Sequence, residues 1–155
     1  MIKLSSGLES ALEAICETAA LVCEASFGSV RLADGKQVFV AAVVSPLTIE
    51  EEPIAITPGG AAWRTILDGE TFQHGDMLAE GSENGRRIAA RDGWRTSLMT
   101  PIESGGKRVG YLTLRRSEVR LFTDEEIGLA RGFAEDAGTA LTEGGFVGPS
   151  LDVPR

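Results

Sequence analysis

The residues best suited to chemistry in this 155-residue chain gather in one stretch, GGAAWRTILDGETFQHGDM, from Gly59 to Met77, which contains the only histidine. A histidine acts as a general base when a nucleophile lies within reach and a carboxylate orients its ring. Asp76 follows His74 by two residues, but the intervening Gly75 leaves the chain free to turn the two side chains apart. A nucleophile motif such as GxSxG does not occur. We therefore expect this stretch to bind a molecule or to pack in a core, and we expect no catalytic residue.

Two tryptophans and an arginine leave two interpretations open. Trp63 and Trp94 can be large core residues, which is the commoner role, or can cover a pocket and offer the indole N–H to a ligand. Arg95 can bind an anion or lie at the surface. His74, at the end of an expected strand, can be a partly exposed structural residue or a polar group of a pocket.

The two cysteines predict neither a disulfide nor a metal site. Cys16 and Cys23 lie seven residues apart, which on a helix is ~10.5 Å and exceeds the ~7 Å that a disulfide allows between Cα atoms. One histidine and no CxxC motif exclude the usual zinc ligand patterns. Free thiols, no apolar stretch of ~20 residues and no signal-peptide core predict a cytoplasmic protein that does not enter a membrane.

The charge of the chain argues against nucleic-acid binding, because the formal net charge is −8. The distribution is uneven, since residues 86–120 include nine Lys or Arg and three Asp or Glu. This segment predicts either a local basic face or arginines that solvate strand ends and a helix surface.

The elements that position these residues begin with a long helix and a hairpin. Apolar residues recur every three or four positions over residues 7–25, after a capping box formed by Ser6 and Glu9. A strand that ends near Leu32 turns through residues 33–36 into QVFVAAVVS. Because that run is apolar on both faces, it predicts a central strand covered on both sides.

The middle of the chain predicts short elements. A helix over residues 59–68 begins at a Thr-Pro pair and ends at Gly69. A short strand over 71–74 follows, and a second short helix begins after Ser82 and stops at Gly93.

The last third predicts a hairpin, a long helix and a tail. RTSLMTPI and RVGYLTLR are strands joined by a Gly-Gly turn, and Pro101 places its strand at an edge or at a bulge. A capping box, Thr123 to Glu126, opens a helix over 124–142. The composition predicts a domain over residues 1–143 and a flexible tail over 144–155 that is rich in Gly and Pro. Because Gly and Pro disfavour a helix, we expect that the last helix does not continue into a long signalling helix.

The order of elements and the stretches GETFQHGDMLAE, GWRTSLMTPI, RVGYLTLRRSEVRLFTDEEI and GFAEDAGTAL resemble a GAF domain. The similarity is greatest to GAF domains of bacterial hybrid sensor histidine kinases and nucleotide cyclases. It implies an α+β fold, with a six-stranded antiparallel sheet, the terminal helices on one face, and short helices and loops that form a pocket on the other.

Specialised branches of the family do not match this sequence. The cyclic-nucleotide branch carries an Asn-Lys…Phe…Asp-Glu signature, and no Asn-Lys pair occurs here. The bilin branch attaches its chromophore through a cysteine after the pocket helix, and the haem branch has a histidine where this chain reads ARDGWRTS. The methionine-R-sulfoxide reductase branch needs pocket cysteines, whereas both cysteines here lie on the first helix. The cofactor, if any, is unknown.

The resemblance implies a non-catalytic sensory or regulatory domain that binds a small molecule and modulates a signalling partner, as in two-component systems. The alternative is an interaction or dimerisation module whose vestigial pocket is filled by its own side chains. A homodimer through the terminal helices is expected, with Ala130, Ala134 and Ala137 allowing close approach either of a partner or of the sheet. A signalling protein would act in trans. The ligand-binding candidates are Trp63, His74, Ile66, Trp94 and Met99.

Overall fold

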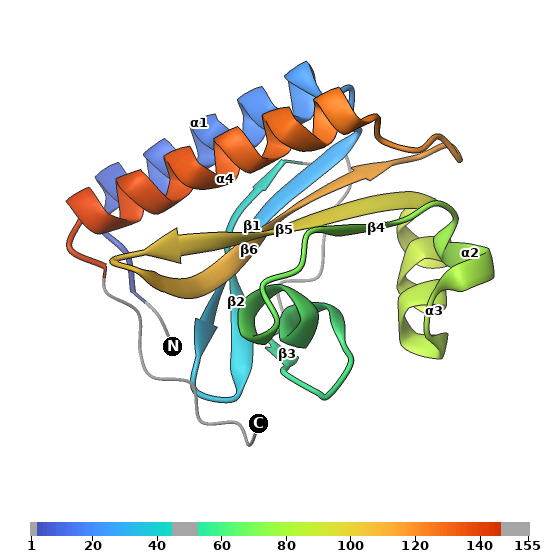
Figure 1. Cartoon of the computed structure of the whole chain (residues 1–155), viewed down its shortest axis with the longest axis horizontal. Coiled ribbons are helices and arrows are strands. Elements are labelled where there is room, and N and C mark those ends of the chain that lie inside the picture. The colour runs from blue at the N-terminus through green and yellow to red at the C-terminus, as the bar shows by residue number, and fades with distance from the viewer. Residues whose placement is uncertain (1–2, 45–52, 147–155) are drawn as a thin grey trace.

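The computed structural model describes residues 3–44 and 53–146, which form a six-stranded antiparallel sheet with helices on both faces (Figure 1). The strand order is β3-β2-β1-β6-β5-β4. The strands are β1 Phe27–Asp34, β2 Gln37–Val44, β3 Ile54–Ala55, β4 Phe72–His74, β5 Thr96–Ser104 and β6 Lys107–Arg116. The helices are α1 Ser6–Val22, α2 Met77–Glu80, α3 Glu83–Asp92 and α4 Asp124–Glu143, with a short π-helix, η1, at Trp63–Leu67. The expected α+β class and antiparallel sheet are confirmed.

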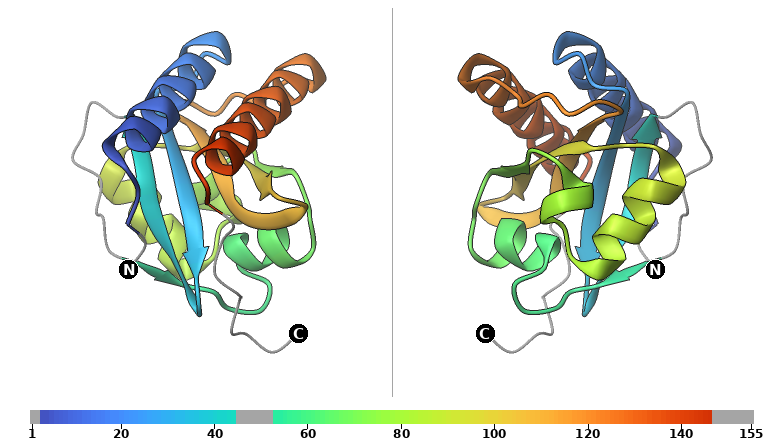
Figure 2. Two further views of the ribbon diagram at one scale, coloured as in Figure 1. Left: turned by 90° about the vertical axis from the view of Figure 1, so that its left-hand side faces the viewer. Right: turned by 90° about the vertical axis from the view of Figure 1, so that its right-hand side faces the viewer.

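The terminal helices α1 and α4 lie side by side and antiparallel on one face of the sheet (Figures 1 and 2). The main hydrophobic core fills the space beneath them, with Leu12, Val30, Leu98, Leu112, Leu114 and Leu141 among its buried side chains. Ala130, Ala134 and Ala137 are buried in this core, so these small residues serve the packing of α4 on its own sheet and are not free for a partner. Gly138 lies on the same face of α4 as these alanines and must be small, because a Cβ there would collide with the carbonyl oxygen of Glu103 on β5.

Local capping signals place most helix ends. Thr123 and Glu126 form the expected capping box of α4, and Ser82 caps α3 through the Gly85 N–H. The helix α1 begins one residue earlier than expected, because Ser5 is the extended residue (φ −66°, ψ 155°) whose hydroxyl accepts from the Leu8 N–H. Ser6 is therefore already helical and the predicted Ser6–Glu9 box is wrong.

Strand β2 is not the central strand that its apolar sequence predicted. It pairs with β1 along its length, but on its other side only Gln37 and Val38 pair with β3. Only Val38 and Ala42 of β2 are buried. The strand is therefore the second from an edge. The pairing of β1 with β6 puts those two strands at the centre of the sheet instead.

The short elements also differ in detail from the expectation. Residues 58–60 form a turn with Gly59 at φ 76°, so the predicted helix over 59–68 is shorter, and its five residues Trp63–Leu67 adopt the wider π-helical winding. The four-residue helix α2 was not expected, although Asp76 caps it through the Leu78 N–H. Pro101 lies beyond the residues that pair with β4, next to a register shift at Ile102, in agreement with its predicted place.

The C-terminal end of the domain is described as far as Phe146. The helix α4 ends at Glu143 and Gly144 caps it. Phe146 packs against the main core, and its carbonyl accepts from the Ser104 hydroxyl at 2.7 Å. Residues 147–155, most of the predicted tail, lie outside the described residues, and the predicted boundary at residue 143 stays a prediction.

Candidate functional site

The sheet face turned away from α1 and α4 carries an ordered set of polar and aromatic side chains. Because side chains alternate along a strand, the residues between the core leucines and valines of β1, β5 and β6 lie on this second face. Strand pairing aligns them in three rows across the sheet. The rows are Phe27, Arg115, Ser97 and His74; Ser29, Thr113, Met99 and Phe72; and Arg31, Tyr111 and Pro101.

A cavity of about 350 Å³ lies over these rows. Its other walls are the turn and helix start at 59–64, and the segment that includes α2 and α3. Figure 1 shows η1, α2 and α3 on this side of the sheet, opposite the terminal helices. The aromatic and sulfur-containing lining residues are Phe72, His74, Met77, Trp94, Met99 and Tyr111. The cavity thus combines flat apolar walls with a few polar groups, the usual character of a small-molecule site.

Three of the five predicted ligand-binding residues meet at this cavity. His74, Trp94 and Met99 line it. Trp63 and Ile66 do not, because η1 directs them into a separate cluster with Ala33, Val38, Ile56, Ala62 and Tyr111. Ligand binding by all five residues stays a prediction, and the placement favours the three that line the cavity.

Sequence reasoning missed three arginines of the cavity lining, Arg31, Arg64 and Arg115. A signal for two of them was present. Arg31 stands between two apolar residues of a strand, so alternation places it on the face opposite to theirs. Arg115 is followed by Arg116, so alternation places these two arginines on opposite faces of the sheet. Strand pairing then brings Arg31 and Arg115 to the same face.

Arg31, Arg115 and Tyr111 form the floor of the cavity, and burial shifts the pKa of all three. Arg31 is only 5% exposed, and burial lowers its pKa. Burial and the neighbouring charge of Arg31 lower the pKa of Arg115 to about 10. Burial raises the pKa of Tyr111, with the two arginines acting in the opposite direction. At neutral pH the floor therefore holds two cations and a neutral phenol.

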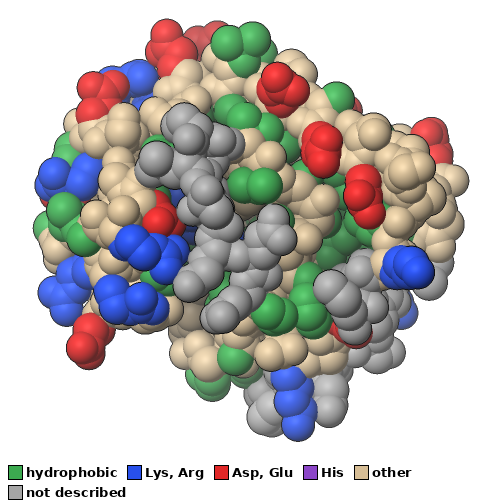
Figure 3. Space-filling view, turned by 180° about the vertical axis from the view of Figure 1, so that it is seen from behind, with side chains coloured by type: hydrophobic (Ala, Val, Ile, Leu, Met, Phe, Trp, Pro, Cys, Tyr) green, Lys and Arg blue, Asp and Glu red, His purple; other side chains and the backbone are tan. Residues whose placement is uncertain are grey.

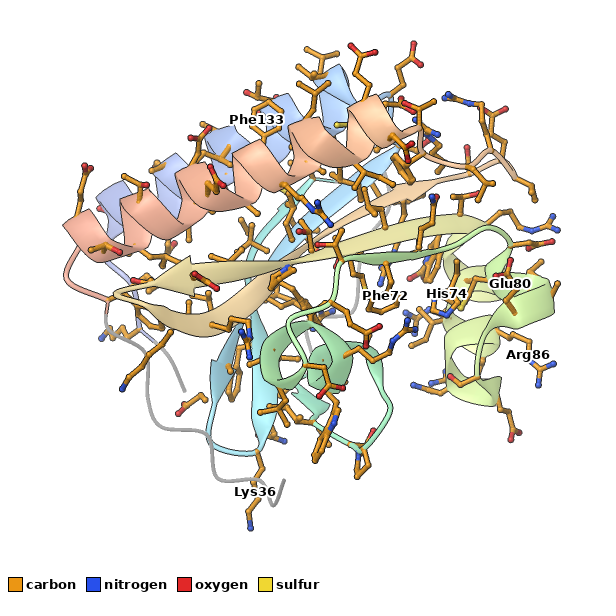
Figure 4. The ribbon with its side chains drawn as sticks, viewed as in Figure 1. Lys36, Phe72, His74, Glu80, Arg86 and Phe133 are labelled. Carbon is orange, nitrogen blue, oxygen red and sulfur yellow. The ribbon has the colours of Figure 1, made fainter. Side chains whose placement is uncertain are left out.

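His74 lies beside Phe72 on the side of β4 that faces η1 and α3 (Figure 4). Their rings meet edge to face, with centroids 5.6 Å apart. The Arg64 guanidinium stacks 3.6 Å from the Phe72 ring centroid and pairs with Glu70. Burial, followed by the charge of Arg64, lowers the pKa of His74, and Glu80 opposes this shift. His74 is therefore a neutral hydrogen-bonding group at pH 7.

Asp76 does not orient His74. Its carboxylate accepts two hydrogen bonds from Arg95, at 2.8 and 2.6 Å, and also caps α2. The Arg95 guanidinium holds the pKa of this carboxyl below its usual value. The two residues that suggested acid–base chemistry thus have separate structural partners.

Comparison with known proteins agrees with this architecture. A protein-family model described as GAF domain matches residues 5–142. The chain belongs to the GAF domain family. No curated protein sequence matches it.

Solved structures similar to this GAF domain include the PixJ GAF domain of Thermosynechococcus elongatus in its blue-light absorbing form, with TM-score 0.78 and 16% identity, over 95% of this chain and 93% of that one. A domain of a putative two-component sensor histidine kinase from Sinorhizobium meliloti 1021 has TM-score 0.73 and 18% identity, over 90% of this chain and 94% of that one. The type II free methionine-R-sulfoxide reductase of Thermoplasma acidophilum has TM-score 0.75 and 13% identity, over 92% and 96%. At such identities the likeness shows the fold.

The cysteines of this GAF domain lie far from the cavity in the fold. Cys16 and Cys23 are free, fully buried and part of the core between α1 and the opposite sheet face. Burial, with the charge of Glu17, raises the pKa of the Cys16 thiol to about 12, so it stays protonated. Within residues 3–44 and 53–146, no cluster of His, Cys, Asp or Glu suits a metal ion, and no helix is long and apolar enough to span a membrane.

A second, larger hollow of about 720 Å³ runs between α4, β5 and the segment at 69–71. It is more open to solvent, and no aromatic side chain is among the described residues that line it. Its polar groups include Thr71 and Thr100, whose hydroxyls bond each other at 2.9 Å. Because it is more open and its described lining has no aromatic wall, we assign the candidate site to the smaller cavity.

Proposed function

We propose that this GAF domain is a non-catalytic sensory module that binds a small organic molecule in the 350 Å³ cavity and modulates a signalling partner. The observation that carries the proposal is the cavity itself, since its volume lies within the ~300–1,000 Å³ typical of ligand sites. A self-filled, vestigial pocket would leave no such space. The two free, buried cysteines support a reducing, cytoplasmic location.

A direct structural route connects the cavity to the helical face. Gln73 lies on β4 between the cavity residues Phe72 and His74. Its side-chain amide donates to the Phe122 carbonyl at 3.1 Å and accepts from the Phe122 N–H at 2.9 Å. Phe122 is buried directly before the capping box of α4. A ligand that moves β4 would therefore shift the start of α4, the helix that a partner protein can contact.

Binding without catalysis agrees with the chemistry of the described residues. Asp76 does not orient His74, because its carboxylate is bound by Arg95. The thiols are buried on the opposite face of the sheet. The cavity thus offers groups that hold a molecule and no activated nucleophile.

A second candidate function is dimerisation through the helical face. Leu21 and Val22 at the end of α1 are 79% and 45% exposed, and Leu129 near the start of α4 is 40% exposed. The two helix ends are neighbours, since the Cys23 thiol lies 3.7 Å from the Glu126 carbonyl oxygen. These exposed apolar residues favour a homodimer, which is compatible with sensing and does not replace it.

The experiment that tests sensing is native mass spectrometry of the protein purified from its own host. We expect a retained small-molecule mass that is lost in Phe72→Ala. Phe133→Ala, which removes a half-buried aromatic ring from α4 on the opposite face, should keep it (Figure 4). Equal retention by both variants would place the ligand elsewhere. No retained mass in folded wild-type protein, with no ligand-dependent stabilisation by host metabolite extract, would contradict sensing.

A further inference from the structure

Five buried side-chain polar atoms have no hydrogen-bond partner among the described residues, and all five belong to the cavity side of the sheet. They are Arg31 Nη1, Trp94 Nε1, Ser97 Oγ, Thr113 Oγ1 and Arg115 Nε. Arg31, Trp94 and Arg115 line the cavity, and Ser97 and Thr113 stand in the same cross-strand rows. Buried polar groups in folded proteins nearly always have partners, so five exceptions at one place require an explanation.

Three of the five unpaired atoms, on Arg31, Trp94 and Arg115, can only donate hydrogen bonds, whereas the Ser97 and Thr113 hydroxyls can donate or accept. A guanidinium and an indole N–H only donate hydrogen bonds, and a guanidinium keeps its charge in proteins. The Trp94 ring covers the Arg115 guanidinium at 4.0 Å, which removes water from one side of it but supplies no acceptor. These three donors therefore lack an acceptor, and a bound molecule that supplies one would satisfy them.

The charge of the cavity points the same way. Its described lining includes Arg31, Arg64 and Arg115 and no Asp or Glu, although the chain carries a net charge of −8. Arg64 is partly balanced by Glu70, whereas neither Arg31 nor Arg115 has a carboxylate within salt-bridge distance in the described chain. The acid whose charge acts on Arg115, Asp92, is paired with Arg91 at 2.8 Å. The buried Arg31 and the half-buried Arg115 thus face the cavity without a carboxylate partner of their own among the described residues.

A smaller hollow of about 270 Å³ adjoins the cavity and shares Arg31 and Arg115 with it. It adds Arg87 and Arg91 of α3 to the surroundings of the pair, together with Asp92, which is paired with Arg91. Figure 3 shows the Lys and Arg side chains gathered on the side of the molecule where α3 lies, and Asp and Glu along the helical side. The surroundings of Arg31 and Arg115 therefore carry more basic than acidic side chains, and a basic surface attracts small anions.

We infer that the ligand of this cavity is an organic oxyanion, a carboxylate or phosphate on a small flat or aliphatic body. The oxyanion binds Arg31 and Arg115, and the body lies against Phe72, Trp94 and Met99. Guanidinium groups receive carboxylate and phosphate oxygens through paired N–H donors, which is the geometry that the two arginines leave unused. This inference rests on the proposed function and adds the chemical class of the ligand to it.

The test compares matched acids and amides by isothermal titration calorimetry on protein that has been unfolded, dialysed and refolded to remove bound molecules. The probe pairs are benzoate and benzamide, phenylacetate and phenylacetamide, and hexanoate and hexanamide, with phenyl phosphate against phenol. At pH 7.5 we expect at least one acid to bind, and its neutral partner to bind about tenfold more weakly or not at all. Inorganic phosphate should compete with the bound acid.

Variants locate the anion. Arg31→Gln and Arg115→Gln should each weaken the bound acid by about tenfold or more while leaving the circular dichroism spectrum unchanged. Arg115→Met provides a second neutral replacement in case glutamine disturbs folding. Arg86→Gln is the matched control, because Arg86 is an exposed arginine of α3 outside both hollows (Figure 4). Its affinity should equal that of wild type.

The outcomes separate this inference from the proposed function. If the amides or phenol bind as well as the acids, or if the arginine variants bind the acid as wild type does, the anion inference is wrong and ligand sensing stands. The same holds if the molecule retained from the host is neutral. If no acid in the panel binds better than its neutral partner, the inference is overturned. If host metabolites also give no binding, the proposed function fails with it.

Discussion

Arg115 and Arg116 are consecutive residues of β6 whose guanidinium groups lie on opposite faces of the sheet and differ completely in their hydrogen bonding. Arg116 is 1% exposed, pairs with Glu126 at 2.6 Å, and donates to the carbonyl oxygens of Cys23, Glu24, Arg120 and Leu121. Arg115 has a buried Nε without a partner. One arginine holds the ends of the terminal helices to the sheet, and its neighbour is left for a ligand.

This contrast predicts that removing Arg116 destabilises the domain far more than removing Arg115. Arg116→Met should lower the free energy of unfolding by ~3–5 kcal/mol, because it leaves Glu126 and four carbonyl oxygens without their donor. Arg115→Met should stay within ~1 kcal/mol of wild type or be stabilising, because it removes a half-buried charge that has no carboxylate partner. Urea unfolding measures both. An Arg115→Met cost as large as that of Arg116→Met would show that Arg115 is a structural residue.

His74 predicts a pH dependence of stability. Its pKa in the folded protein lies below the ordinary value, so the unfolded chain binds the proton more readily. The contribution of neutral His74 is fully present above pH ~6.5 and is lost as the pH falls through the lower, folded value. The urea midpoint of wild type should therefore fall more between pH 7 and pH 5 than that of His74→Gln. Parallel curves for the two proteins would contradict the lowered pKa.

Two glycines of α4 provide a matched pair. Gly138→Ala should destabilise the domain by ~1–3 kcal/mol, because the added Cβ collides with the Glu103 carbonyl and pushes α4 away from β5. Gly128→Ala, at an exposed position with no atom near the added Cβ, should stabilise by ~0.5–1 kcal/mol through helix propensity alone. Thermal unfolding of both variants checks the docking of α4. Equal gains in stability would refute the close approach at Gly138.

The two hydrogen bonds between Gln73 and Phe122 predict that β4, at the cavity, is coupled to the start of α4. Gln73→Ala leaves the N–H and carbonyl of buried Phe122 without partners and should cost ~1–3 kcal/mol. Amide hydrogen exchange should become faster at residues 120–127 and stay unchanged at the far end of α4. Gln73→Glu is the control, because its carboxylate can still accept from the Phe122 N–H and should restore part of the protection. Unchanged exchange in Gln73→Ala would mean that β4 is not coupled to α4.

The proposed homodimer predicts a change in mass for a single surface substitution. Leu21→Glu places a charge on an exposed apolar site of α1 and should convert the dimer to a monomer in light scattering at high micromolar concentration. Leu78→Glu, at an exposed leucine of α2 on the other side of the sheet, should remain dimeric. A wild-type protein that is already monomeric at that concentration would disprove the dimer.

Most secondary structure could be read from local patterns, since a helix cap or a turn depends on residues only a few positions apart. The Thr123–Glu126 capping box and the Gly93 stop, at φ 81°, lie where the sequence predicted them. Strand β2 shows the limit of such reading. An apolar run predicts burial, but the number of neighbouring strands and covering helices is decided by pairing across the sheet, and β3 covers only two of its residues.

The sequence by itself determined the family, the order of elements and the residue types that surround a pocket, because these depend on local periodicity and on motif spacing. Only the tertiary structure decided which side chains meet there. The π-helical winding of η1 turns Trp63 and Ile66 toward Tyr111, an orientation that helix periodicity does not supply. Arg31 and Arg115 share one face because β1 pairs with β6 in a register that aligns Phe27 with Arg115. Alternation along each strand sends each arginine to the face opposite the core residues, but only the register of the pairing decides which residues of the two strands stand opposite each other.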